Sequence, residues 1–242
     1  MKNKINRLIA ITVFVVMCLS FSEYILGQGQ IKRKKQARQE SVQISNPDGY
    51  INGHGYVDMG LPSGRKWATC NVGAGEVCDY GNYFAWGELS PKSTYTKDNS
   101  KTYGVPLTNI SGNKDYDIAS QSWRESWRIP TKDEFEELID LCKWRKIHYK
   151  GVDGHIIIGP NGKSIFLPWA GCMLDSNIDS STGYHMGHYW TATAYKQSSK
   201  TSCPDYDDLS WYVYMSENGP VMFYGNYMYC RGLGLSIRPI SN

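Results

Sequence analysis

The first side chains with metal-binding chemistry are two histidines three residues apart. His185 and His188, in the stretch GYHMGHYW, have a spacing that metal sites use, and Cys203 or Asp205 could supply a third ligand. Glycines on both sides predict a loop, and in a loop this spacing does not place both rings on one face. We therefore predict that the two histidines face solvent or pack in part, without a metal.

Acidic side chains gather in CPDYDDLSW (203–211), where Asp205, Asp207 and Asp208 carry the oxygen ligands that calcium prefers. The rest of a calcium-binding loop is missing, so a solvated acidic turn is the better interpretation. The chain also has no Gly-x-Ser-x-Gly, His-Glu-x-x-His or phosphate-loop motif. The sequence therefore predicts no catalytic residue, no metal and no cofactor.

Cysteines are the next reactive group. The chain has seven, and six of them follow residue 22: Cys70, Cys78, Cys142, Cys172, Cys203 and Cys230. An even number in an exported chain favours disulfide bonds, although spacing alone does not choose their pairing. No Cys-x-x-Cys pair occurs, so a thiolate zinc site is poorly supported.

Aromatic side chains are abundant, with 18 tyrosines and 8 tryptophans in the chain. In WYVYM (211–215), strand alternation places Tyr212 and Tyr214 on one face and the other three side chains on the opposite face. Rigid amphipathic rings on a sheet suit the recognition of a glycan or a protein. We predict a ligand-binding surface of these two tyrosines with Tyr224 and Trp190. The alternative is that both faces are covered in a compact domain.

One helix is predicted in the folded part of the chain. Thr131 is a good N-cap, and Glu134 three residues later completes a capping box. Acidic residues follow at the positive start of the helix dipole, and basic residues lie at its negative end. The helix is expected over about 132–144. Its apolar face should pack against the core, and this face is formed by Phe135, Leu138, Ile139 and Cys142.

The segment WRIPT (127–131) leads into that helix, and Pro130 stops the preceding chain from running into it. We expect Trp127 in the core and Arg128 paired with a buried or loop carboxylate such as Asp117. The segment is therefore interpreted as a structural joint.

Short β-strands separated by turn residues account for the rest of the folded part. Residues 90–121 are polar and aperiodic, and we expect them to form one long surface excursion. Hairpins are predicted at Pro160-Asn161-Gly162 and at Asn218-Gly219. With one helix, this pattern predicts an α+β fold. Strands are expected at 55–60, 65–70, 82–87, 155–159, 163–168, 188–195, in the hairpin 211–225, and at 234–240.

Several stretches together resemble the Fibrobacter succinogenes major paralogous domain. They run in order from residue 52 to the C-terminus: NGHGYVDMGLPSGRKWATCNVGA (52–74), YGNYFAWGE (80–88), SWRIPTKDEFEELIDLCKW (126–144), GKSIFLPWAG (162–171), HYWTATAY (188–195) and SIRPI (236–240). The resemblance implies an exported bacterial protein with no established activity. Cys70 and Cys142 lie within matched stretches, and we predict that they form a disulfide bond.

The WRIPTKDEFEEL stretch is similar, more distantly, to the formylglycine-generating enzymes, whose fold is related to the C-type lectins. This implies a compact α+β domain with small antiparallel sheets, long loops and its two ends close together. Those enzymes bind copper through a cysteine pair, whereas here Cys230 has no second cysteine near it. The calcium and sugar motifs of the lectins are also missing. The fold is therefore expected without this chemistry.

The N-terminus resembles a secretory signal. Basic residues precede an apolar run, which is too short to span a membrane, and cleavage is expected after Ser22 or alternatively after Gly29. Lipid attachment at Cys18 is less favoured, because Met17 before it is large. We predict a signal peptide at 1–22, a basic disordered linker at 23–49 and one domain at 50–242.

Charge argues against nucleic acid as a partner. The formal net charge is +3, but residues 46–242 carry 18 basic and 21 acidic residues, a net charge of −3. We predict a secreted, periplasmic or surface-exposed interaction module that binds a glycan or an extracellular protein without catalysis. The alternatives are a divergent oxidase or other modifying enzyme and a structural component of a surface assembly.

Overall fold

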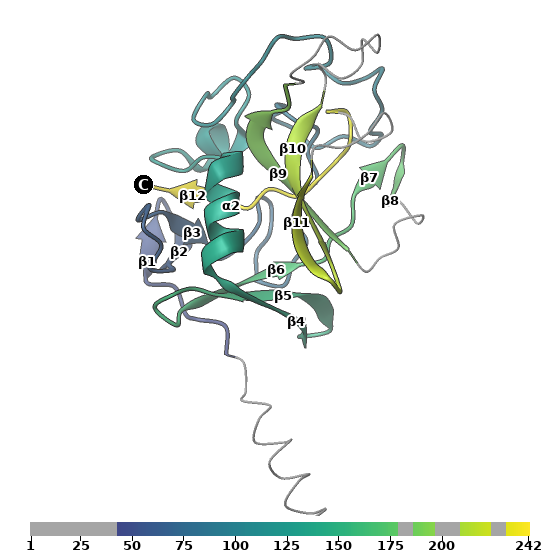
Figure 1. Ribbon diagram of the computed structural model, residues 1–242. Helices are drawn as coiled ribbons and strands as arrows, with labels where there is room; N and C mark the ends of the chain where they lie inside the picture. The colour runs from purple at the N-terminus through teal and green to yellow at the C-terminus, as the bar shows by residue number, and fades with distance from the viewer. Residues whose placement is uncertain (1–42, 179–185, 197–208, 224–230) are drawn as a thin grey trace, which may run out of the picture. The chain divides into compact units, whose positions relative to one another are not determined.

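The computed structural model describes residues 43–178, 186–196, 209–223 and 231–242. The chain divides into two compact units, Met1–Gln43 and Ile44–Asn242, and the second is the folded domain shown in Figure 1. The predicted signal peptide and most of the linker lie outside the described residues. The domain begins at Ile44, not at residue 50 as predicted. Ser45 Oγ accepts a hydrogen bond from the Ser164 amide at 2.8 Å, and Asp48 forms an ion pair with Lys163.

The first sheet joins the beginning and the end of the domain. Its strands β1 (Gly49–Ile51), β2 (His54–Asp58), β3 (Lys66–Ala68) and β12 (Ile240–Ser241) lie in the order β1-β2-β3-β12. All the pairings are antiparallel. The two ends of the domain therefore lie close together, as the resemblance implies.

Three further antiparallel sheets are present among the described residues of the domain. One contains β4 (Lys143–Tyr149), β5 (Val152–Ile158) and β6 (Ser164–Pro168). Another contains β9 (Gly187–Ala194), β10 (Ser210–Ser216) and β11 (Gly219–Phe223), in the order β11-β10-β9. In the remaining sheet, β7 (Met173–Leu174) pairs with β8 (Asn177–Ile178). The predicted α+β class with small antiparallel sheets is confirmed.

Most predicted strands are present, but two of the predictions are wrong. Residues 82–87 and most of 234–240 form no strands. One isolated bridge joins the two segments, between Phe84 and Leu235. The excursion at 90–121 is not confined to the surface, since Tyr95, Ile110 and Ile118 are buried. A π-helical turn that we did not predict, η1 (Ala119–Trp123), lies at its end.

The helix α2 (Lys132–Leu141) has the predicted capping box. It ends before the predicted residue 144, because the backbone is already extended at Cys142 and β4 begins at Lys143. The basic residues assigned to the last turn therefore lie on a strand. Trp144 still contacts the helix, since its Nε1 donates to the carbonyl of Leu138 at 3.1 Å.

Two hydrophobic clusters form the core, and the β9-β10-β11 sheet contributes to both. The first surrounds Trp86, Trp127 and Trp190, and the second contains Trp67 and Phe135. Helix α2 lies between the β1-β2-β3-β12 sheet and the β9-β10-β11 sheet (Figure 1). Across the described residues, no helix is long and apolar enough to span a membrane.

Candidate functional site

The predicted aromatic residues do share one face of the β9-β10-β11 sheet. Strand β10 pairs with β9 so that Tyr212 lies opposite Trp190 and Tyr214 lies opposite His188. Because directly opposite residues point to the same side of a sheet, these four rings lie on one face in two neighbouring rows across the strands, Trp190 with Tyr212 and His188 with Tyr214. The Tyr212 and Trp190 rings meet edge to face, with 5.8 Å between their centroids. The alternation in WYVYM therefore predicted this geometry correctly.

Two of these residues are nevertheless core residues and cannot contact a ligand. Trp190 is 1% exposed and Tyr212 is 3% exposed, and both belong to the first hydrophobic cluster. The Trp190 Nε1 donates to the Phe84 carbonyl at 2.8 Å, so the ring is satisfied inside the domain. The predicted binding role is therefore wrong for both. Tyr214 is half-buried, and Tyr224 lies outside the described residues.

The exposed part of the same face lies on the edge strand β11. Val221 is 52% exposed and pairs with Tyr214, and Phe223 is 40% exposed and pairs with Tyr212. The Phe223 and Tyr212 rings meet edge to face at 5.6 Å between their centroids. We call Tyr214, Val221 and Phe223 the exposed margin. Burial decreases along one row of side chains, from the core at Trp190 to this margin.

The backbone edge of β11 is less suited to binding than its side chains. Pairing begins at the two-residue turn with Ser216 opposite Gly219, so Met215 and Pro220 form the following, non-hydrogen-bonded pair. The backbone nitrogen of Pro220, which carries no hydrogen, therefore points away from β10. Sheets tolerate proline at such edge positions. Such an edge disfavours the addition of another strand. A ligand at the margin would be held by side chains.

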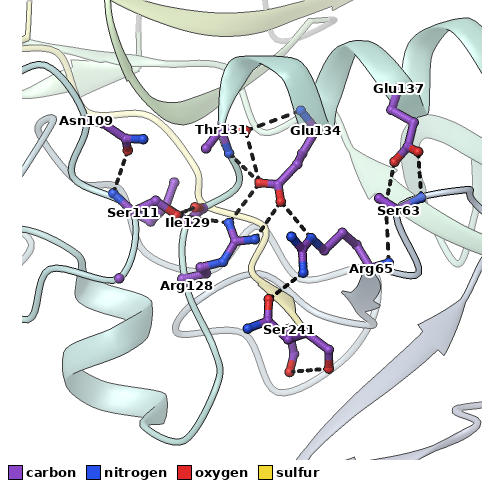
Figure 2. A network of polar contacts seen from close by, with 12 residues as sticks. Ser63, Arg65, Asn109, Ser111, Arg128, Ile129, Thr131, Glu134, Glu137 and Ser241 are labelled. Carbon is purple, nitrogen blue, oxygen red and sulfur yellow. Dashed lines mark hydrogen bonds and ion pairs between the residues drawn. The ribbon is translucent and has the colours of Figure 1, made fainter.

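The second candidate is a polar cluster at the start of α2 (Figure 2). The Glu134 carboxylate accepts two hydrogen bonds from Arg128, at 2.5 and 2.8 Å, and one from Arg65 Nε at 2.9 Å. The amide and hydroxyl of Thr131 also donate to it, at 2.9 and 3.1 Å. Arg65 in turn donates to Asn242 Oδ1 at 2.6 Å. The cluster joins β3, the helix start and the last residue of the chain.

Every part of this cluster serves the fold. Burial by itself would raise the pKa of Glu134, but the hydrogen bonds from Arg128 and Thr131 and the charge of Arg128 outweigh it, so the pKa is lowered. The carboxylate stays ionised and its acceptors are occupied, which leaves it unsuited to act as a base. The predicted structural roles of Thr131 and Glu134 are therefore confirmed.

The predicted partner of Arg128 is wrong. Arg128 pairs with Glu134, whereas Asp117 is fully buried and accepts hydrogen bonds from the amides of Gly112, Ser120 and Ile129, at 2.8 to 3.0 Å. Burial raises the pKa of Asp117, although these amides oppose the effect. Its role is to fix the chain around η1. Trp127 is 1% exposed, so its predicted place in the core is confirmed.

The predicted disulfide bond is not present. Cys70 and Cys142 are both free thiols. Strand β3 points Trp67 toward α2, where it meets Phe135, whereas Ala68 packs in the other cluster. Cys70 lies in the bend beyond the end of β3. Burial and the charge of Glu137 raise the pKa of the Cys142 thiol to about 11.

Most of the residues weighed as metal ligands fall outside the described residues: His185, Cys203, Asp205, Asp207, Asp208 and Cys230. His188 is 1% exposed and its ring meets that of Tyr214 at 5.2 Å between the centroids, so it packs in the core. Among the residues that the structure describes, no three His, Cys, Asp or Glu side chains are placed to hold a metal ion.

One buried histidine with a hydrogen-bond partner has no counterpart in the sequence analysis. Trp169 Nε1 donates to His155 Nδ1 at 2.9 Å, and His155 is 2% exposed. Burial lowers the pKa of His155 to about 4, and the charge of Lys146 contributes. The alternation of HIIIG gave no sign of this pair, since the two residues lie on different segments.

The chain was compared with models of protein families, with curated proteins and with solved structures, and none of the three comparisons finds a match.

Proposed function

We propose that this chain is a non-catalytic interaction module that binds a glycan or an extracellular protein through the exposed margin. The observation that carries the proposal is the pair of neighbouring side-chain rows on this face, which end in Val221 and Phe223 at 52% and 40% exposure. Large exposed apolar side chains side by side favour contact with a partner. The buried rings behind them hold these rows rigid, which lowers the entropy lost on binding.

The proposal extends to the fold and the location of the protein. We propose a C-type-lectin-like domain of the Fibrobacter succinogenes major paralogous type, exported by the signal at 1–22. The pairing of β12 with β3 and the single α-helix support the lectin-like comparison. The basic start and short apolar run of the N-terminus support export.

A screen of the mature chain on glycan and extracellular-protein arrays tests the binding function and separates the two ligand classes. The affinity for each ligand found is then measured for Val221→Ser with Phe223→Ser. We expect this double variant to weaken binding about tenfold or more, because a central aromatic contact is commonly worth that much.

Leu141→Ser is the matched control, since Leu141 is 47% exposed at the end of α2, and α2 packs with Val213 and Met215 on the opposite face of the sheet. This control should bind like the unmodified chain. Equal affinity of the margin variant and the control for every ligand found would refute the proposed site. An array with no ligand of either class would refute the proposed function.

A further inference from the structure

Two consecutive non-glycine residues have left-handed backbone angles. Arg124 has φ 60° and ψ −161°, and Glu125 has φ 52°. The Cβ atom of an L-residue crowds the neighbouring carbonyl at such angles, so the conformation costs free energy that glycine would avoid. Both side chains are exposed, and burial does not compensate for this cost. They directly follow η1, and π-helical turns are rare and often functional.

The β1-β2 hairpin holds the residue just before the strained pair. Asn52 Nδ2 donates to the Trp123 carbonyl at 2.6 Å, and Trp127 Nε1 donates to the Ile51 carbonyl at 2.9 Å. The His54 ring lies flat on the Trp123 indole, with 3.7 Å between the ring centroids and an angle of 5°. Three contacts from one hairpin therefore flank the two strained residues.

The far side of the turn is anchored as well. The Trp127 amide donates to the Arg124 carbonyl at 3.1 Å, and Ser120 Oγ donates to the Trp127 carbonyl at 2.9 Å. Trp123 and Trp127 meet edge to face at 5.3 Å between their centroids, and Trp123 is only 6% exposed. A strained backbone persists where its surroundings over-determine it, and here the hairpin supplies much of that constraint.

We propose that residues 119–125 form a strained latch that the β1-β2 hairpin holds closed. When the hairpin contacts break, Arg124 and Glu125 relax toward right-handed angles and the Trp123 ring loses its cover. The strain favours opening and the hairpin contacts favour closing, so this corner opens more readily than the core. Opening would expose the aromatic ring of Trp123, next to the charged residues Arg124 and Glu125. The inference is independent of the binding function proposed for the margin.

Hydrogen exchange of the mature chain tests the latch, read at the amides of residues 121–127. Asn52→Gly removes the amide side chain and still permits the positive φ of 46° at this position. We expect this variant to lower protection about tenfold, since a buried carbonyl loses its donor. Arg124→Gly should raise protection about fivefold by removing strain, and in the double variant it should restore most of the loss.

Gln121→Gly is the matched control, because Gln121 is exposed in the same turn and is not among the residues of positive φ. Glycine there should lower protection, which is the opposite of its effect at Arg124. Amides of β5 exchange only on global unfolding, which also breaks the hairpin contact, so their protection should change by a similar factor, while the amides of residues 121–127 stay less protected than those of β5 in every chain. The latch is refuted if Arg124→Gly lowers the protection of residues 121–127 as Gln121→Gly does. It is also refuted if Asn52→Gly changes that protection by less than about twofold, or if the amides of residues 121–127 are as protected as those of β5 in the unmodified chain.

Discussion

Replacing Glu134 with glutamine removes the charge at the centre of the polar cluster and keeps the size of the side chain. Five hydrogen bonds end on this carboxylate, three from Arg65 and Arg128 and two from Thr131. Glutamine keeps one acceptor oxygen, while its NH₂ group must face a donor. The variant therefore leaves two guanidinium groups without their counter-charge in a partly buried site.

The expected loss follows from the exposure of the partners. A hydrogen bond to a charged group contributes about 1.5–3 kcal/mol when buried. The side chains of Glu134 and Arg128 are 13% and 15% exposed, but that of Arg65 is 32% exposed, so water replaces part of what is lost. We expect Glu134→Gln to lower the free energy of unfolding by about 2–3 kcal/mol. Urea unfolding measures this loss. The slope of the unfolding free energy against urea concentration should be the same in both chains, which shows that the two free energies can be compared.

Asp133→Asn is the control, because Asp133 is an exposed acidic residue in the same helical turn. It should cost at most about 0.5 kcal/mol, which is the size of a dipole effect. Since the pKa of Glu134 is lowered on folding, its contribution is present above the unfolded pKa and is lost as the pH falls through the folded pKa. Below about pH 4.5 the variant should therefore lose less stability than the unmodified chain. A loss within 0.5 kcal/mol of the control at pH 7 would refute this reasoning.

Two further changes test other parts of the fold. The pKa of His155 falls to about 4 on folding. The unfolded chain therefore binds a proton more readily, so the stability of the fold is full above the unfolded pKa of 6.5 and decreases as the pH falls toward 4. We expect His155→Gln to reduce the change of the unfolding free energy between these two pH values by about 2–3 kcal/mol. A chain that begins at residue 50 should be about 1–2 kcal/mol less stable in urea than one that begins at residue 43, because it lacks the contacts of Ser45 and Asp48. Equal stability of the two chains would refute the domain start at Ile44.

Features decided within one element were predicted well from the sequence. The capping box of Thr131 and Glu134 and the hairpin around Asn218-Gly219 depend on a few neighbouring residues, and both are present, although the two-residue turn is Glu217-Asn218 and Gly219 begins β11. Strand alternation likewise placed Tyr212 and Tyr214 on one face, because alternation is a property of the strand itself.

Features decided by tertiary contacts were predicted less well. Alternation tells which side chains share a face but not whether the face is covered, so Trp190 was assigned to a binding surface although it is core. The helix was extended to 144 because basic residues continue past its end, whereas pairing with β5 makes them a strand. Arg128 was given the wrong carboxylate, since its choice between Asp117 and Glu134 is set by packing.

The margin itself could be inferred only in part. Tyr214 was predicted from the alternation, but Val221 and Phe223 carry no signal in the sequence that marks them as exposed. Their exposure follows from the position of β11 at the edge of its sheet.

Hydrogen exchange of the mature chain, with and without the tightest ligand from the arrays, tests the central claim most directly. If the exposed margin is the binding site, the ligand should slow exchange at the amides of residues 212–223 and leave unchanged the amides that exchange by local opening elsewhere in the domain, while amides of β5 slow only through the gain in overall stability. Unchanged exchange in 212–223 with protection elsewhere in the domain would contradict the proposed site.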